Sequence, residues 1–176
     1  MPTNTAVLAL AASLTLAPAL ARAADFNAQM TGFEEVGDLN AETGAILTNG
    51  HAQLLLRLDP RSQTIQYQLT IADTTSAVVQ AHIHFGRERQ PGGPLAFLCS
   101  NANNGPAGTP KCPTGGGTVS GTIIPAQLLG IAAQDVPANN FSAIVAILAS
   151  GSAYANVHTA NFPKGEMRGQ LVAVEQ

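Results

Sequence analysis

The sequence predicts an all-β fold, an antiparallel Greek-key sandwich or barrel with one or two short helical insertions. Short segments in which apolar and polar residues alternate are separated by turn residues along most of the chain. Charged residues make up only 11% of the sequence, against about 25% in an average soluble domain. We find no internal repeat and no linker after the N-terminal segment, so we expect a single domain.

The N-terminal segment predicts a signal peptide over residues 1–23. Ala6–Leu20 is an apolar run, and the small residues Ala21 and Ala23 fit the rule for cleavage after Ala23. The run is shorter than the ~20 apolar residues that a transmembrane helix needs. No Lys or Arg precedes it, so an uncleaved anchor remains the alternative. We expect a periplasmic or secreted domain over residues 24–176, without stable membrane insertion after cleavage.

Alternation then predicts the strands in chain order. In residues 64–71 every second residue is apolar, which is typical of a half-buried strand, and Asp59–Ser62 forms the turn that joins it to the preceding strand. A strand that follows the apolar run Ala77–Val79 contains His82 and His84. The other expected strands are residues 25–32, 50–58, 94–99, 118–124, 153–158 and 165–174.

Two segments predict the helical insertions. Pro125–Gly130 resembles a single helical turn. Residues 140–149 are apolar at nearly every position, but their alanines, a cap at Asn140 or Ser142 and the closing Gly151 favour a short buried helix over a strand.

Histidines are the strongest chemical signal in the sequence. Three of the four lie in two strand-like segments, Ala81–Gly86 and Tyr154–Thr159. Side chains alternate along a strand, so His82 and His84 point to the same face, and His158 lies in the second segment. Neutral imidazole is the commonest ligand for transition metals. We therefore expect the three to bind one ion, copper first because the affinity order peaks there, with zinc as the second choice.

Further residues are candidates for completing this site. Glu166 is the natural carboxylate for a fourth ligand, and Met167 or Met30 would add a soft ligand for Cu(I). Asn156 would orient an imidazole through its other nitrogen. We expect His51 to be a surface strand residue rather than a ligand.

The same histidines have a second interpretation. As buried residues that hydrogen-bond to backbone or carboxylate groups they would brace the sheet, and the domain would be an extracellular structural or protein-interaction module. Glu166 and Arg168 share a strand face, which predicts an ion pair between them or with Arg87, or a guanidinium that guides an anion towards the metal. No catalytic triad or paired carboxylates stand out, so we expect binding rather than catalysis.

Cys99 and Cys112 bracket a polar, turn-rich loop and predict a disulfide. The rival interpretation, a thiolate metal or redox pair, fits less well because the spacing is far from C-x-x-C and an exported dithiol oxidises. The net charge of −3 and the absence of Trp give no reason to expect a nucleic-acid partner, which leaves a metal ion or an extracellular protein.

The combined motifs resemble a known family. Ala81–Gly86, Gly93-Pro94 before a strand that ends at Cys99, Tyr154–Thr159 and Phe162–Leu171 are similar to those of the chordin-type (CHRD) domain. The match extends from Met30 to Leu171, although Gly37-Asp38 stands where the family usually has a proline pair. The resemblance implies an exported, β-rich domain and little about its biochemistry.

A weaker resemblance is to the copper site of Cu,Zn superoxide dismutase. There too, a His-x-His strand and a distant Val-His strand place three imidazoles on one ion, the roles that His82, His84 and His158 would take here. No histidine lies between His84 and His158, so the bridging histidine and the zinc site have no counterpart. The resemblance makes a copper-only dismutase a minor alternative to a copper-binding, buffering or delivery protein.

Overall fold

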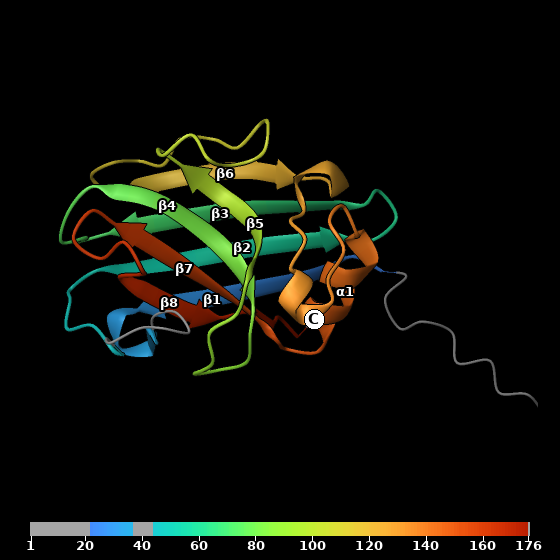
Figure 1. Ribbon diagram of the computed structural model, residues 1–176, viewed down its shortest axis with the longest axis horizontal. Coiled ribbons are helices and arrows are strands. Elements are labelled where there is room, and N and C mark those ends of the chain that lie inside the picture. Colours follow the sequence, from blue (N-terminus) through green and yellow to red (C-terminus); the bar gives the residue numbers. More distant parts are fainter. Residues whose placement is uncertain (1–21, 37–43, 176) are drawn as a thin grey trace, which may run out of the picture.

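The computed structural model describes residues 22–36 and 44–175, which form one antiparallel sheet curled into a nearly closed barrel (Figure 1). This confirms the predicted fold class. In chain order the strands are β1 (Ala24–Thr31), β2 (His51–Asp59), β3 (Thr64–Ala72), β4 (Val78–Phe85), β5 (Pro94–Ser100), β6 (Gly117–Ile123), β7 (Ala153–Thr159), β8 (Met167–Gln170) and β9 (Val172–Ala173).

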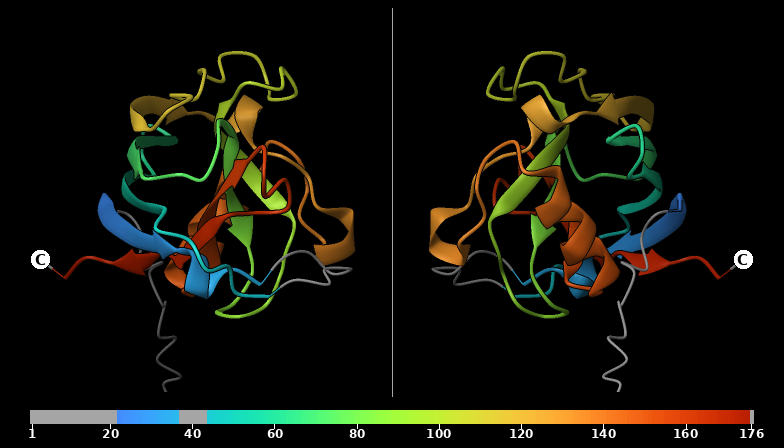
Figure 2. Two further views of the ribbon diagram at one scale, coloured as in Figure 1. Left: turned by 90° about the vertical axis from the view of Figure 1, so that its left-hand side faces the viewer. Right: turned by 90° about the vertical axis from the view of Figure 1, so that its right-hand side faces the viewer.

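The order of the strands brings distant parts of the chain together. Neighbours in the sheet run β5-β4-β7-β8-β1-β2-β3-β6, and β9 also pairs with β1. In Figure 1, β4, β5 and β7 cross in front of β1, β2 and β3, and Figure 2 shows the same two layers end-on. The hydroxyl of Tyr67 on β3 donates a hydrogen bond to the carbonyl of Leu98 on β5, which links the two layers.

Alternation sets which residues face the core. In β3 the four apolar residues Ile65, Tyr67, Leu69 and Ile71 are all buried, and the glutamines between them are exposed. The turn before β3 is held by the Asp59 carboxylate, which accepts hydrogen bonds from the backbone amides of Arg61 and Ser62. This hairpin follows the sequence prediction.

The helical insertions also form where they are expected. Helix α1 (Phe141–Ala149) begins after Asn140, whose side chain accepts a hydrogen bond from the amide of Ala143, and Gly151 follows its end with φ +68°. The predicted turn after β6 is a 3-10 helix, η2 (Pro125–Gln127). Two further 3-10 turns are η1 (Gly32–Glu34) and η3 (Ala132–Gln134).

One predicted strand is divided in the structure. We expected a single strand over residues 165–174, but β8 and β9 are separated at Leu171, whose side chain is buried. The amide of Leu171 still donates to the carbonyl of Ala153 on β7, whereas the next residue, Val172, pairs with Asn27 of β1. Both parts pair with β1 in the same register, but only β8 also pairs with β7, so the break falls where the pairing with β7 ends.

Two predictions fall largely outside the described residues. The signal peptide over residues 1–23 has only its last two residues among them, and Gly37-Asp38 lies in the undescribed segment 37–43. Within the described ranges, no helix has the length and apolar character required to span a membrane.

Candidate metal centre

Strands β4 and β7 pair antiparallel and bring the three predicted histidines together. His82 lies opposite Asn156, and the residue two before it, Gln80, lies opposite His158. The residues that alternate with the histidines, such as Ile83, are fully buried in the hydrophobic core. The imidazoles therefore lie on the outer side of the barrel wall.

Loops and a neighbouring ring cover this outer face. His82, His84 and His158 are only 5%, 8% and 7% exposed. The loop after β4 reaches His84 through the carbonyl of Gly92, the loop after β7 reaches His158 through the carbonyl of Pro163, and the Phe97 ring of β5 packs edge-on against His82 at 4.4 Å between centroids. The site is thus a buried cluster of imidazoles rather than an open surface patch.

The ligand nitrogens of the three histidines converge. One ring nitrogen from each lies within 4.8 Å of the other two, and His82 Nδ1 is 3.1 Å from His158 Nε2. Nitrogens that share one ion at about 2 Å are roughly 3–4 Å apart. A shift of about 1 Å in the most distant ring would therefore close the set around an ion.

Backbone carbonyls fix the orientation of two of the rings. His84 Nδ1 lies 2.9 Å from the Gly92 carbonyl oxygen, and His158 Nδ1 lies 3.0 Å from that of Pro163. A carbonyl oxygen only accepts, so Nδ1 carries the proton in both rings and Nε2 presents a lone pair. Metal-binding histidines are commonly held by this kind of hydrogen bond on the other ring nitrogen.

The lone pair of His158 Nε2 has two neighbours. His82 Nδ1 donates to it, and the side-chain amide of Asn156 lies 3.1 Å away. Rotating that amide by 180° exchanges its oxygen and nitrogen, and only the NH₂ orientation suits a lone pair. In contrast, His84 Nε2 is buried and makes no hydrogen bond of good geometry with the described residues, although the Asn156 side chain lies near enough to raise the pKa of His84 slightly. An unpaired buried acceptor of this kind costs about 1–3 kcal/mol.

Burial keeps the three rings neutral. It lowers the pKa of His82 to about 2, with further lowering from the neighbouring His158 and His84. Burial also lowers the pKa of His84 to about 4, against a smaller opposing effect of the Gly92 carbonyl, and it lowers the pKa of His158. Near pH 7 the three rings are therefore uncharged, and Nε2 of His84 and of His158 carries a lone pair.

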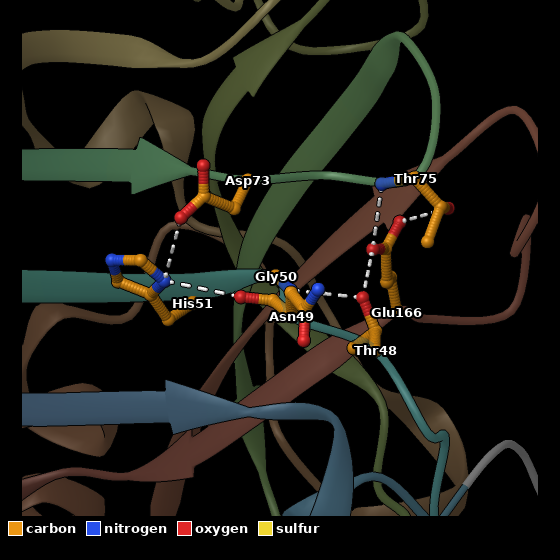
Figure 3. A network of polar contacts seen from close by, with 7 residues as sticks. All are labelled: Thr48, Asn49, Gly50, His51, Asp73, Thr75 and Glu166. Atoms are coloured by element: carbon orange, nitrogen blue, oxygen red, sulfur yellow. Dashed lines mark hydrogen bonds and ion pairs between the residues drawn. The ribbon is translucent and has the colours of Figure 1, made fainter.

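Glu166 does not join the histidines. Its buried carboxylate accepts hydrogen bonds from the hydroxyls of Thr48, Thr75 and Thr159, at 2.8, 2.9 and 2.6 Å, and from the Thr75 amide at 3.0 Å. Figure 3 shows this carboxylate between Thr48 and Thr75. Burial alone would raise the pKa of Glu166, but these hydrogen bonds lower it overall. The carboxylate that we expected as a fourth ligand is thus held by threonines, and the histidine cluster does not include it.

The two methionines are also turned away. Met167 and Met30 belong to the hydrophobic core and are 0% and 1% exposed. Met167 pairs with Val157, between Asn156 and His158 on β7, so alternation places its side chain on the opposite side of the wall from the histidines. Neither methionine supplies the soft ligand that we expected.

Arg168 is buried beside the site and fastens its covering loop. Its Nη2 donates to the carbonyls of Arg87 and Gln90, at 2.8 and 3.0 Å. Its guanidinium lies 3.5 Å from the centre of the Tyr154 ring, and that ring stacks on His84 with 4.8 Å between centroids. These contacts replace the expected ion pair with Glu166 or Arg87.

Sequence reasoning missed three contributors to this site: Tyr154, Gly92 and Pro163. Tyr154 could have been found, because it shares the parity of Asn156 and His158 along β7. The Gly92 and Pro163 carbonyls leave no trace in the residue pattern. His51, expected at the surface, has a side chain that is 59% exposed, and it contacts Asp73 and the Asn49 carbonyl (Figure 3).

The two cysteines are bonded to each other, as predicted. The Cys99–Cys112 sulfurs are 2.08 Å apart and the Cα atoms 5.0 Å apart. Both side chains belong to the core, so the pair is a structural crosslink and its sulfurs are not part of the histidine site. A disulfide suits an oxidising compartment.

Comparisons with known proteins give one result. No curated protein and no solved structure matches the chain significantly. The family model described as the CHRD domain matches residues 26–171, which include every histidine and both cysteines. The chain therefore belongs to the CHRD domain family.

Proposed function

We propose that this chain is an exported copper-binding protein that holds one ion with His82, His84 and His158, and that it buffers or delivers copper outside the cytoplasm. Imidazole nitrogen suits Cu, Zn and Ni, and the affinity order of such sites peaks at copper. The disulfide and the CHRD family, an extracellular type of domain, support the location.

One observation carries the proposal. His84 Nε2 is buried without a hydrogen bond of good geometry to the described residues and lies in the same cluster as the ligand nitrogens of the other two rings. If the histidines only braced the sheet, burying this unpaired nitrogen would lower the stability of the fold with no compensating interaction. A metal ion would be its missing partner, while the Gly92 and Pro163 carbonyls would keep two rings oriented.

Metal binding would require a proton to move on His82. In the structure His82 Nδ1 donates to His158 Nε2, so it carries the proton on the side of the cluster. For Nδ1 to become a ligand, this proton must be released or transferred to Nε2 of the same ring. The metal-free and metal-loaded forms would then differ in the tautomer of His82, which ¹⁵N chemical shifts of the imidazole report.

The metal is tested by titrating copper into purified mature protein. We expect one copper per chain, and an ion present at 100 times its Kd would raise the unfolding free energy by about 2.7 kcal/mol and Tm by roughly 5–10 °C. Cu(II) would show nitrogen hyperfine structure in its EPR spectrum. The chain has no Trp and only two Tyr, so quenching of tyrosine fluorescence would report binding beside Tyr154, with Tyr154→Phe as the reference.

Matched variants separate the site from adventitious binding. His84→Gln and His158→Gln should abolish the rise in Tm, whereas His51→Gln, which changes an exposed histidine on β2, should keep it. An unchanged Tm with copper, zinc and nickel would contradict the proposal. The chain would then be the structural or protein-interaction module.

A further inference from the structure

The cluster of ligands carries no negative charge. Among the described residues, the group able to hold a metal consists of three histidines with no carboxylate or thiolate. Glu166 is occupied by threonines, and the cysteines are bonded to each other. The ligands would therefore not neutralise the charge of an ion bound at this buried site.

The charged side chain that acts on His84 is a cation, Arg168, which is itself opposed by the buried carboxylate of Glu35. Arg168 is 2% exposed, and its guanidinium stacks on the Tyr154 ring, which in turn stacks on His84. Like burial, this positive charge lowers the pKa of His84. The outer nitrogens of His84 and His158 donate hydrogen bonds to neutral carbonyls. A neutral carbonyl raises the basicity of the ligand nitrogen less than a carboxylate would.

We propose that this site selects monovalent copper, Cu(I), over Cu(II) and Zn(II), an inference that rests on the proposed function. The cost of moving an ion out of water rises with the square of its charge, so a buried neutral ligand set penalises a divalent ion far more than a monovalent one. Three ligands also satisfy Cu(I), whereas Zn(II) needs a fourth and Cu(II) prefers a tetragonal arrangement.

The covering loops sharpen this selection. Water could complete the coordination of a divalent ion at an open site, but the imidazoles here are at most 8% exposed. Gly92, Pro163 and Phe97 occupy the outer side of the rings. The ion enters as Cu(I) by exchange with another copper ligand, so binding requires no oxidant or reductant.

Competition with chelators of known affinity tests the inference on the full mature chain. Under anaerobic conditions, Cu(I) is offered with bathocuproine disulfonate, and Cu(II) and Zn(II) are offered with nitrilotriacetate. We expect the Kd for Cu(I) to be at least 100-fold smaller than the Kd for Cu(II). For a one-electron couple, a 100-fold difference raises the reduction potential of the bound copper about 120 mV above that of the free ion.

A negative charge introduced at the site should weaken the preference for Cu(I). Asn156→Asp places a carboxylate next to His158 Nε2 and should lower the ratio of Cu(I) to Cu(II) affinity at least tenfold. Gln68→Glu makes the same change on the exposed face of β3, four strands from β7 in the sheet, and should leave the ratio unchanged. Arg168→Met, which removes the cation, should shift the ratio in the same direction as Asn156→Asp.

The outcomes separate the two proposals. If Cu(II) or Zn(II) binds the wild-type chain stoichiometrically and at least as tightly as Cu(I), the selection is overturned while copper binding stands. If no ion binds in either oxidation state, both proposals fail. The wild-type competition alone decides the inference, whether or not the variants fold.

Discussion

Acidification should destabilise the metal-free protein well before its carboxylates titrate. His82 and His84 are neutral and buried, with pKa values of about 2 and about 4, whereas an unfolded histidine has a pKa near 6.5. The unfolded chain therefore takes up protons below pH 6.5 that the folded chain refuses. Stability is complete above that pH and is lost as the pH falls towards the folded pKa values.

The size of this loss follows from the two pKa differences. Between pH 7 and pH 5 each of these two histidines removes about 2 kcal/mol from the unfolding free energy, or about 4 kcal/mol together. Burial also lowers the pKa of His158, which adds to this loss of stability. Since domains are stable by about 5–15 kcal/mol, the loss is a large share of the total.

Urea denaturation followed by circular dichroism, at several pH values and with a chelator present, measures this loss. His84→Gln should reduce the dependence of the unfolding free energy on pH by about 1.2 kcal/mol between pH 6 and pH 5. His51→Gln, which changes an exposed side chain, should leave the pH dependence of the unfolding free energy as in the wild type. A free energy that stays within about 1 kcal/mol over this range would refute the reasoning that the cluster is neutral and buried.

Three further perturbations test the scaffold. Replacing Cys99 and Cys112 by Ser should cost about 3 kcal/mol in urea denaturation, and a reductant should abolish the difference from wild type; an equal stability without reductant would argue against the crosslink. Asn140→Ala should cost about 1 kcal/mol through loss of the helix cap, while Ser142→Ala at an exposed position of the same helix should cost less; equal losses would speak against the cap. Glu166→Gln should cost about 1–3 kcal/mol, because the threonine donors around it lose a charged acceptor, and no change would contradict that network.

The fold could be predicted because alternation and turn chemistry agree along most of the chain. In β3 each apolar residue is buried, and Asp59 shapes the turn before it. Helix α1 was separable from a strand because Asn140 and Gly151 mark its ends. The split between β8 and β9 was not predictable, since it depends on where the pairing with β7 ends while the pairing with β1 continues.

At the site, the alternation of side chains along a strand correctly predicted the histidine cluster. Closeness in sequence to His158 was a poor guide to further ligands. Same-face spacing and the pairing of β4 with β7 bring the three histidines together. Glu166 and Met167 follow closely in the chain, but one is held by threonines and the other faces the core. Backbone carbonyls that orient the rings, such as that of Gly92, depend on loop conformation and cannot be found from residue type.

The wide separation of the histidines along the chain has a consequence for the order of events in the life of the protein. His82 and His158 are 76 residues apart, and only the finished ladder between β4 and β7 brings them within 3.1 Å. A chain that has not yet folded presents isolated imidazoles with weak affinity for a metal ion. On the proposed function, cargo is therefore captured after the barrel has assembled, and occupancy of the site reports completed folding.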